Sequence, residues 1–176
     1  FTHLHSDHAV DLYQLIISSW HSYRVKPWKI YGPKGTKKFV KKIMDAWAEE
    51  RKLRISYESR ASAKAFEMQV TEFKSIGSIK IKDVNIKYFE VDHKPVKYAY
   101  GFCFTNNSKK LTISGDTRPC ENLMKYAQKS DLLLHEVFIE GEILQTNKMR
   151  TKKTLHNVQS YHTTSTQVGK VAFISR

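Results

Sequence analysis

Cysteine, proline and glycine are scarce in this sequence, with 2, 4 and 7 of them among 176 residues. The two cysteines, Cys103 and Cys120, cannot build a disulfide framework or a Cys-x-x-Cys metal site. This favours a reducing compartment, in which both would be small core residues. Because no apolar run approaches the roughly 18 residues of a membrane span, we expect a soluble, cytoplasmic protein without a membrane partner.

Acidic residues are also few, since 17 Asp and Glu stand against 30 Lys and Arg and give a formal charge of +13. Such a charge suits a polyanionic partner such as nucleic acid. However, 23 of the basic residues are lysines spread along the chain, and phosphate recognition in a fixed geometry more often uses arginine. The charge alone therefore does not distinguish a solvated surface from a nucleic-acid-binding surface.

Hydrophobic residues make up 40% of the chain and aromatic residues 12%, which indicates one folded domain. Helical spacing predicts a helix after His8 and another from Thr36. The second has a core stripe formed by Phe39, Val40, Ile43, Met44 and Trp47. Pro119 suits the first turn of a helix that reaches about Lys129. A last helix is expected to start near His162 and to turn inward Val168, Val171 and Ala172.

Alternating and β-branched residues predict strands in the middle of the chain. These are residues 28–31, 79–82, 84–91, 98–104, 111–114 and 131–134, the last a strand of buried type. Residues 32–35 and 106–108 are expected to be turns, and residues 140–160 to be loop-like. Helices alternating with strands around a block of strands predict an α/β layered domain with ligand-type residues at strand ends.

The opening stretch, FTHLHSDH, carries the strongest chemical signal. It places His3, His5, Asp7 and His8 around a tight turn between a strand end and a helix. Imidazole nitrogens and a carboxylate that converge in this way suit zinc, or alternatively manganese or iron. One turn cannot close two coordination shells, so further ligands must come from elsewhere. The candidates at strand ends and near the last helix are His93, Asp116 and His162.

Taken together, the motifs resemble the metallo-β-lactamase fold, and within it ribonuclease Z and its shorter relatives. The matching stretches are Thr2–His8, Val91-Asp-His93, Ser114-Gly-Asp-Thr117, Leu134-His-Glu136 and Tyr161-His-Thr-Thr164, which span residues 1 to about 172. The resemblance implies an αββα sandwich. It also implies that the 176-residue domain is incomplete at both ends, lacking its opening strands and a last strand with one more metal-binding histidine.

Specific roles follow from this resemblance. His3, His5 and His93 would hold one zinc ion, Asp7 and His8 a second, and Asp116 would bridge the two, with Mn²⁺ or Fe²⁺ as alternatives. Asp7 would also orient the attacking hydroxide or take its proton. His162 would give a proton to the leaving group, and Glu136 would orient His162. His135 is expected to play a packing role, and His21 and His156 to lie on the surface.

The expected function is a phosphodiesterase or endoribonuclease that acts on RNA or tRNA 3′ ends. The resemblance also implies a homodimer, because relatives commonly dimerise. Two differences from ribonuclease Z favour a second hypothesis about the function. Only residues 94–115 separate the His93 and Asp116 motifs, which leaves no room there for the tRNA-gripping arm, and Val137-Phe138 replaces Ala-Thr. These features suit short relatives with small substrates such as sulfate esters or cyclic nucleotides. A non-catalytic metal- or nucleic-acid-binding domain is the third reading.

Overall fold

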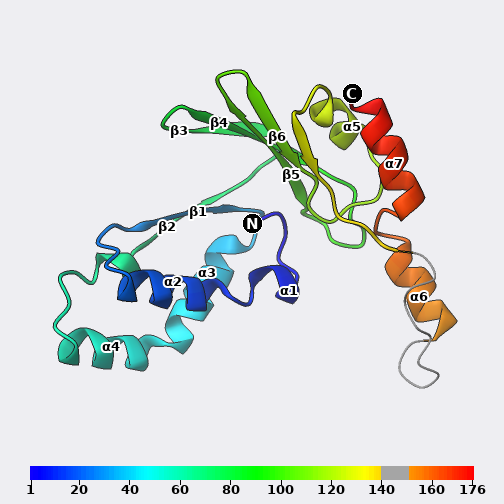
Figure 1. Cartoon of the computed structure of the whole chain (residues 1–176). Coiled ribbons are helices and arrows are strands. Elements are labelled where there is room, and N and C mark those ends of the chain that lie inside the picture. The colour runs from blue at the N-terminus through cyan, green and yellow to red at the C-terminus, as the bar shows by residue number, and fades with distance from the viewer. Residues whose placement is uncertain (140–150) are drawn as a thin grey trace. The chain divides into compact units, whose positions relative to one another are not determined.

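The computed structural model describes residues 1–139 and 151–176, and these fall into two compact units (Figure 1). The first unit comprises Phe1 and residues 3–74, and the second comprises Thr2 and residues 75–176. That the two units form the single domain expected from the chain length stays a prediction.

A parallel pair of strands organises the first unit. Strand β1 (Trp28–Gly32) pairs with β2 (Met68–Glu72), with Trp28 opposite Met68. Helices α1 (Ser6–Ala9) and α2 (Leu12–His21) precede β1, and α3 (Thr36–Ala46), α4 (Ala48–Tyr57) and the 3-10 helix η1 (Lys64–Phe66) connect β1 to β2. Apolar side chains from these elements form one core, whose buried members are Leu12, Tyr13, Ile16, Ile17, Trp20, Ile30, Val40, Met44 and Ala65.

The start of α3 depends on the end of β2. Gly35 has a left-handed backbone with φ of 103° directly before the helix. The carboxylate of Glu72 accepts hydrogen bonds from the backbone N–H of Gly35 at 2.9 Å and of Lys37 at 2.8 Å. A negative charge at a helix N-terminus also complements the helix dipole. Glu72 therefore locks the lysine-rich helix onto the sheet.

The second unit is a five-stranded sheet with helices. Its strands follow one another in chain order: β3 (Gly77–Ile81), β4 (Val84–Glu90), β5 (Tyr100–Asn106), β6 (Lys109–Ile113) and β7 (Leu132–Leu134). Neighbours from β3 to β6 are antiparallel, whereas β6 and β7 are parallel. Helix α5 (Glu121–Ala127) makes the β6–β7 crossover, and α6 (Lys152–Gln159) and α7 (Ser165–Ile174) follow β7.

One face of this sheet is covered by α5 and α7 (Figure 1). Leu123 of α5 and Val171 of α7 pack against Phe89 of β4 and Cys103 of β5, and all four are buried. The core role expected for Cys103 is confirmed, whereas Cys120 is only partly buried, beside Thr117, its Sγ 3.8 Å from the Thr117 Oγ1. Residues 94–115 hold β5 and β6, so strands fill the span between His93 and Asp116.

Several expected details of the helices are wrong. Trp47 does not continue the buried stripe of α3, because that helix ends at Ala46. The residue is 48% exposed, and its ring stacks on that of Tyr13 with the centroids 5.1 Å apart. Part of the expected 140–160 loop, Lys152–Gln159, is helix α6, whose N-cap Thr151 accepts a hydrogen bond from Thr154 N. Residues 140–150 of that expected loop lie outside the described residues.

The last strand and the last helix also differ from expectation. Leu132 and Leu134 of β7 are 60% and 58% exposed, because β7 is the edge of the sheet among the described strands. Helix α7 starts at Ser165, since Thr164 and Gln167 form a reciprocal capping box there. Val171 is buried as expected, Val168 is half-buried, and Ala172 is exposed.

Candidate metal centre

Three histidines of the opening motif lie together in the first unit. His5 is the N-cap residue of α1 and has an extended backbone, so the chain turns there and places Asp7 and His8 in the helix. The His3 ring is 4.7 Å from the His5 ring and 4.4 Å from the His8 ring, measured between centroids. Asp7 is 75% exposed, and its Oδ2 lies 3.5 Å from His8 Nε2. The turn therefore gathers nitrogen and oxygen donors at one place.

His93 and Asp116 meet in the second unit. The Nδ1 atom of His93 lies 2.9 Å from the backbone oxygen of Tyr161. Because a carbonyl only accepts, Nδ1 carries the hydrogen and Nε2 of the neutral ring keeps its lone pair. That Nε2 lies 3.9 Å from the Asp116 carboxylate. The imidazole nitrogen and the carboxylate oxygen both donate electron pairs and face each other in a largely buried place. Such a pair of donors can bind a divalent cation.

His162 and Glu136 lie beside this pair. The His162 ring is 5.2 Å from the His93 ring, and its Nδ1 lies 3.3 Å from Glu136 Oε1. The same carboxylate oxygen accepts hydrogen bonds from Thr163 N at 2.9 Å and from Thr117 N at 3.3 Å. Glu136 is therefore fixed by backbone amides while it contacts the imidazole. His135 turns its Nδ1 to the backbone oxygen of Glu136 at 2.6 Å.

The loops that follow β4, β6 and β7 are joined by a β-bridge and by hydrogen bonds. Asp92 and Arg118 form an isolated antiparallel bridge, with Arg118 N donating to Asp92 O at 2.9 Å. Ser114 Oγ accepts from Glu136 N at 3.0 Å. Between them, Gly115 has φ of +62°, and a Cβ there would lie 2.7 Å from the Tyr100 carbonyl oxygen. Glycine is thus required immediately before Asp116.

The structure also shows residues that the sequence analysis missed. Tyr161 acts through its backbone oxygen, which no side-chain pattern reveals. Arg118 and His156 line a cavity of about 470 Å³ together with His162, although His156 is exposed as expected. His21 lies apart from these clusters, with Nε2 3.3 Å from Arg54 Nη1.

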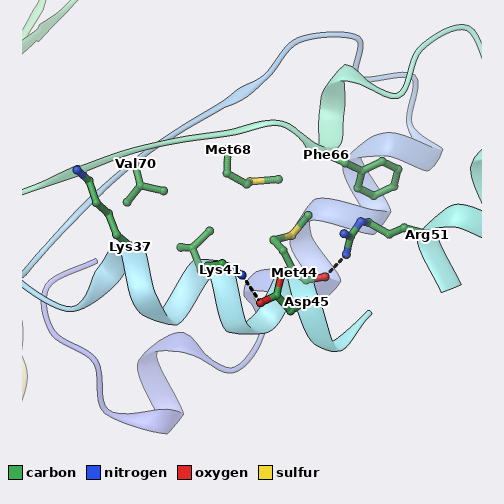
Figure 2. Close-up of a pocket in the computed structure, with 9 residues that line it drawn as sticks. Lys37, Lys41, Met44, Asp45, Arg51, Phe66, Met68 and Val70 are labelled. Atoms are coloured by element: carbon green, nitrogen blue, oxygen red, sulfur yellow. Dashed lines mark hydrogen bonds and ion pairs between the residues drawn. The ribbon is translucent and has the colours of Figure 1, made fainter. Parts of the chain in front are cut away.

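A second cavity of about 470 Å³ lies in the first unit between α3 and β2. Its apolar floor is formed by Val40, Met44, Phe66, Met68 and Val70, and Lys37, Lys41 and Arg51 surround it (Figure 2). Two of these basic side chains have partners within the unit: Lys41 Nζ lies 2.6 Å from Asp45 Oδ2, and Arg51 donates a hydrogen bond to the Met44 carbonyl. None of the predicted site residues lines it.

Comparison with known proteins identifies the family of this chain. The model of the family "anti-Pycsar protein Apyc1" matches residues 1–166. The chain belongs to the Apyc1 family. A ribonuclease Z from Mycobacterium bovis (strain BCG / Pasteur 1173P2) is 28% identical over 174 residues, which are 97% of this chain and 60% of the relative.

Solved structures show the fold of this Apyc1-family chain. The short form of human tRNase Z matches with a TM-score of 0.68 at 20% identity, over 99% of this chain and 66% of that one. The metallo-β-lactamase fold protein YhfI from Bacillus subtilis matches with a TM-score of 0.65 at 17% identity, over 99% and 58% of the two chains. The expected metallo-β-lactamase fold and ribonuclease Z resemblance are confirmed. The chain spans about three fifths to two thirds of these three proteins.

No described helix combines the length and the apolar run that crossing a bilayer requires.

Proposed function

We propose that this protein hydrolyses phosphodiester bonds with the help of two divalent cations, in the manner of its ribonuclease Z relatives, and that RNA 3′ ends are its substrate. The observation that carries the proposal is the cluster in the second unit. There a lone-pair nitrogen of His93 faces a carboxylate of Asp116, and His162, oriented by Glu136, lies next to them. Ligand and acid side chains of this kind are what metal-assisted hydrolysis needs.

The proposed ligand sets follow the motifs. His3, His5 and His93 would hold one cation, Asp7 and His8 would hold the other, and Asp116 would contribute its carboxylate to both. The donors within each unit fit zinc, because they are imidazole nitrogens and carboxylates.

The reaction consumes one water, whose oxygen bonds to phosphorus while the bond to the leaving oxygen breaks. Bound cations would supply hydroxide at neutral pH and offset charge on the phosphoryl oxygens. Asp7 orients the attacking water and takes its proton. His162 gives a proton to the leaving oxygen, which keeps the electron pair of the broken bond. Glu136 is a positioning residue, since it acts by holding the His162 ring.

Asp7→Ala tests this proposal in the metal-loaded protein expressed from its complete gene. The substitution should lower hydrolysis of bis(p-nitrophenyl) phosphate at least about a hundredfold, because it removes a ligand and a proton acceptor together. Asp11→Ala is the matched control, since Asp11 precedes α2 and no role is proposed for its side chain. If the unsubstituted protein with zinc, manganese or iron leaves the ester intact, the proposal is wrong.

A second candidate keeps the site and changes the substrate to a small ester, such as a cyclic nucleotide or a sulfate ester. One observation favours it: β5 and β6 occupy the span in which ribonuclease Z is expected to carry its arm. Parallel assays on an RNA with a 3′ extension, on cyclic nucleotides and on an aryl sulfate distinguish the candidates. The preferred substrate is the one with the highest kcat/KM.

A further inference from the structure

Thr117 lies between the loops that carry the proposed ligand and catalytic side chains of the second unit. It is fully buried, and it directly follows Asp116 in the chain. Its Oγ1 accepts a hydrogen bond from Asp92 N at 3.2 Å. The single hydroxyl hydrogen can be donated to Asp92 O at 3.3 Å or to Arg118 O at 2.7 Å. The hydroxyl thus ties the residue before His93 to the segment after Asp116.

The backbone of Thr117 makes two further links. Its N–H donates to Glu136 Oε1 at 3.3 Å, and its carbonyl oxygen accepts from Thr163 Oγ1 at 2.5 Å. Thr163 is fully buried and directly follows His162. Thr117 therefore contacts Glu136 itself and the residue next to His162.

These links close into a circuit of hydrogen bonds that also includes the His93 ring. His93 Nδ1 donates to the backbone oxygen of Tyr161 at 2.9 Å. Tyr161 lies two residues before Thr163, whose hydroxyl leads back to Thr117. The Thr117 hydroxyl then leads back to the residue before His93. Because each loop in the circuit is held at two points, one link holds the others in place.

The separation of the two proposed ligands in this unit depends on the circuit. His93 Nε2 and Asp116 Oδ2 lie 3.9 Å apart. Zinc–nitrogen and zinc–oxygen bonds of about 2.0–2.2 Å can join two donors only when these lie within about 4.4 Å of each other. The observed separation fits this limit, but moving one loop outward by about 1 Å would exceed it.

We propose that Thr117 is a positioning residue whose hydroxyl sets the separation of His93 from Asp116, and thereby the affinity of the protein for its cation. The inference rests on the proposed function, because it takes these two side chains as ligands of one cation. Residues that hold metal ligands by hydrogen bonds typically contribute roughly 10–100-fold to the affinity for the metal. Loss of the hydroxyl should therefore weaken metal binding.

Zinc titration of the protein expressed from its complete gene, in competition with a chromophoric chelator, tests this role. Thr117→Val removes the hydroxyl and keeps nearly the same shape, so the Kd for zinc should rise about tenfold or more. Thr117→Ser keeps the hydroxyl and should hold the Kd within about threefold of its original value.

Thr112→Val is the matched control. Thr112 is a fully buried threonine of β6, and its Oγ1 lies 3.3 Å from Tyr126 O and 2.8 Å from Ser130 Oγ. Neither partner belongs to the circuit, so this variant should lower the unfolding temperature and leave the Kd for zinc unchanged. If Thr117→Val leaves the Kd unchanged, or if Thr112→Val raises it as much, the inference is wrong.

Thr163→Val covers the case in which Thr117→Val does not fold. It removes the hydroxyl that donates to the Thr117 carbonyl and leaves the Asp92 contacts in place. Because the circuit is then opened at another link, the Kd for zinc should rise about threefold or more. An unchanged Kd in this variant would also contradict the inference.

Nuclear magnetic resonance of the metal-free protein separates this inference from the proposed function. The buried His93 ring should give a slowly exchanging Nδ1–H signal. Thr117→Val should shift this signal or lose it to exchange, whereas Thr112→Val should not. If the unsubstituted protein neither binds zinc nor cleaves an ester, the proposed function fails, and this signal alone decides on Thr117. If esters are cleaved but the Kd for zinc does not depend on the Thr117 hydroxyl, the positioning role fails alone.

Discussion

Substitution of Glu136 tests whether one carboxylate oxygen holds Thr117, Thr163 and the His162 ring in place. Its Oε1 accepts from Thr163 N at 2.9 Å and from Thr117 N at 3.3 Å, and it lies 3.3 Å from His162 Nδ1. The side chain is only 15% exposed, and Thr117 and Thr163 are buried. Each buried amide left without an acceptor costs about 1–3 kcal/mol. Since the contact at 3.3 Å is the weaker one, Glu136→Ala should cost about 2–4 kcal/mol.

Glu136→Gln separates the charge of this residue from its hydrogen bonds. The amide oxygen of Gln can still accept from both backbone N–H groups, so the free energy of unfolding should fall by only about 1 kcal/mol. The charge that faces His162 is lost, so kcat on diesters with an alkoxide leaving group should fall about tenfold or more. Hydrolysis of bis(p-nitrophenyl) phosphate should fall less, because p-nitrophenolate leaves without a proton.

Urea unfolding followed by circular dichroism measures both variants, with the exposed Glu67→Ala as a control that should stay within about 0.5 kcal/mol. The reasoning is refuted if Glu136→Ala is no less stable than Glu136→Gln. It is refuted for His162 if the alkoxide and phenolate substrates lose activity equally.

Two further predictions concern residues outside the proposed set of metal ligands. Burial and the hydrogen bond with Glu50 raise the pKa of Tyr13 to about 12. Stability from the neutral phenol is therefore present below pH about 10 and lost as the pH rises through about 12, so an ultraviolet titration of Tyr13→Phe should lack one tyrosine that ionises near pH 12. Gly115→Ala should destabilise by at least about 1–2 kcal/mol, because φ is +62° there and the added Cβ meets the Tyr100 oxygen. Gly169→Ala, in open space on helix α7, should instead stabilise by about 0.5–1 kcal/mol. Urea unfolding that gives the two alanines the same sign would contradict this pair.

The motifs were predictable because they combine short-range spacing with strand ends. The turn from His3 to His8 is local, so its donors could be grouped from sequence, and the structure places the His3, His5 and His8 rings together. His93 and Asp116 follow the ends of strands that can be read from β-branched residues. The proximity of Glu136 and His162 came from the family resemblance, and the structure supplies its physical cause in the amides of Thr117 and Thr163.

Other features depend on long-range contacts that spacing does not reveal. Trp47 has the period of a core residue, but the break between α3 and α4 turns its ring onto Tyr13. Glu72 reads as a polar strand end, yet it caps α3 from 35 and 37 residues away. The exposure of Leu132 and Leu134 follows from strand order in the described sheet, which hydrophobicity alone cannot give.

Glu136 and Arg118 are held in this fold in two different ways. Glu136 binds the backbone of the loop after Asp116 and of the loop after His162, so its removal must disturb stability and acid–base geometry together. Arg118 is held through its side chain by Asp92, and its outer nitrogens make no backbone link among the described contacts. Substitution of Glu136 is therefore expected to disturb the backbone of two loops, whereas substitution of Arg118 changes one side-chain contact.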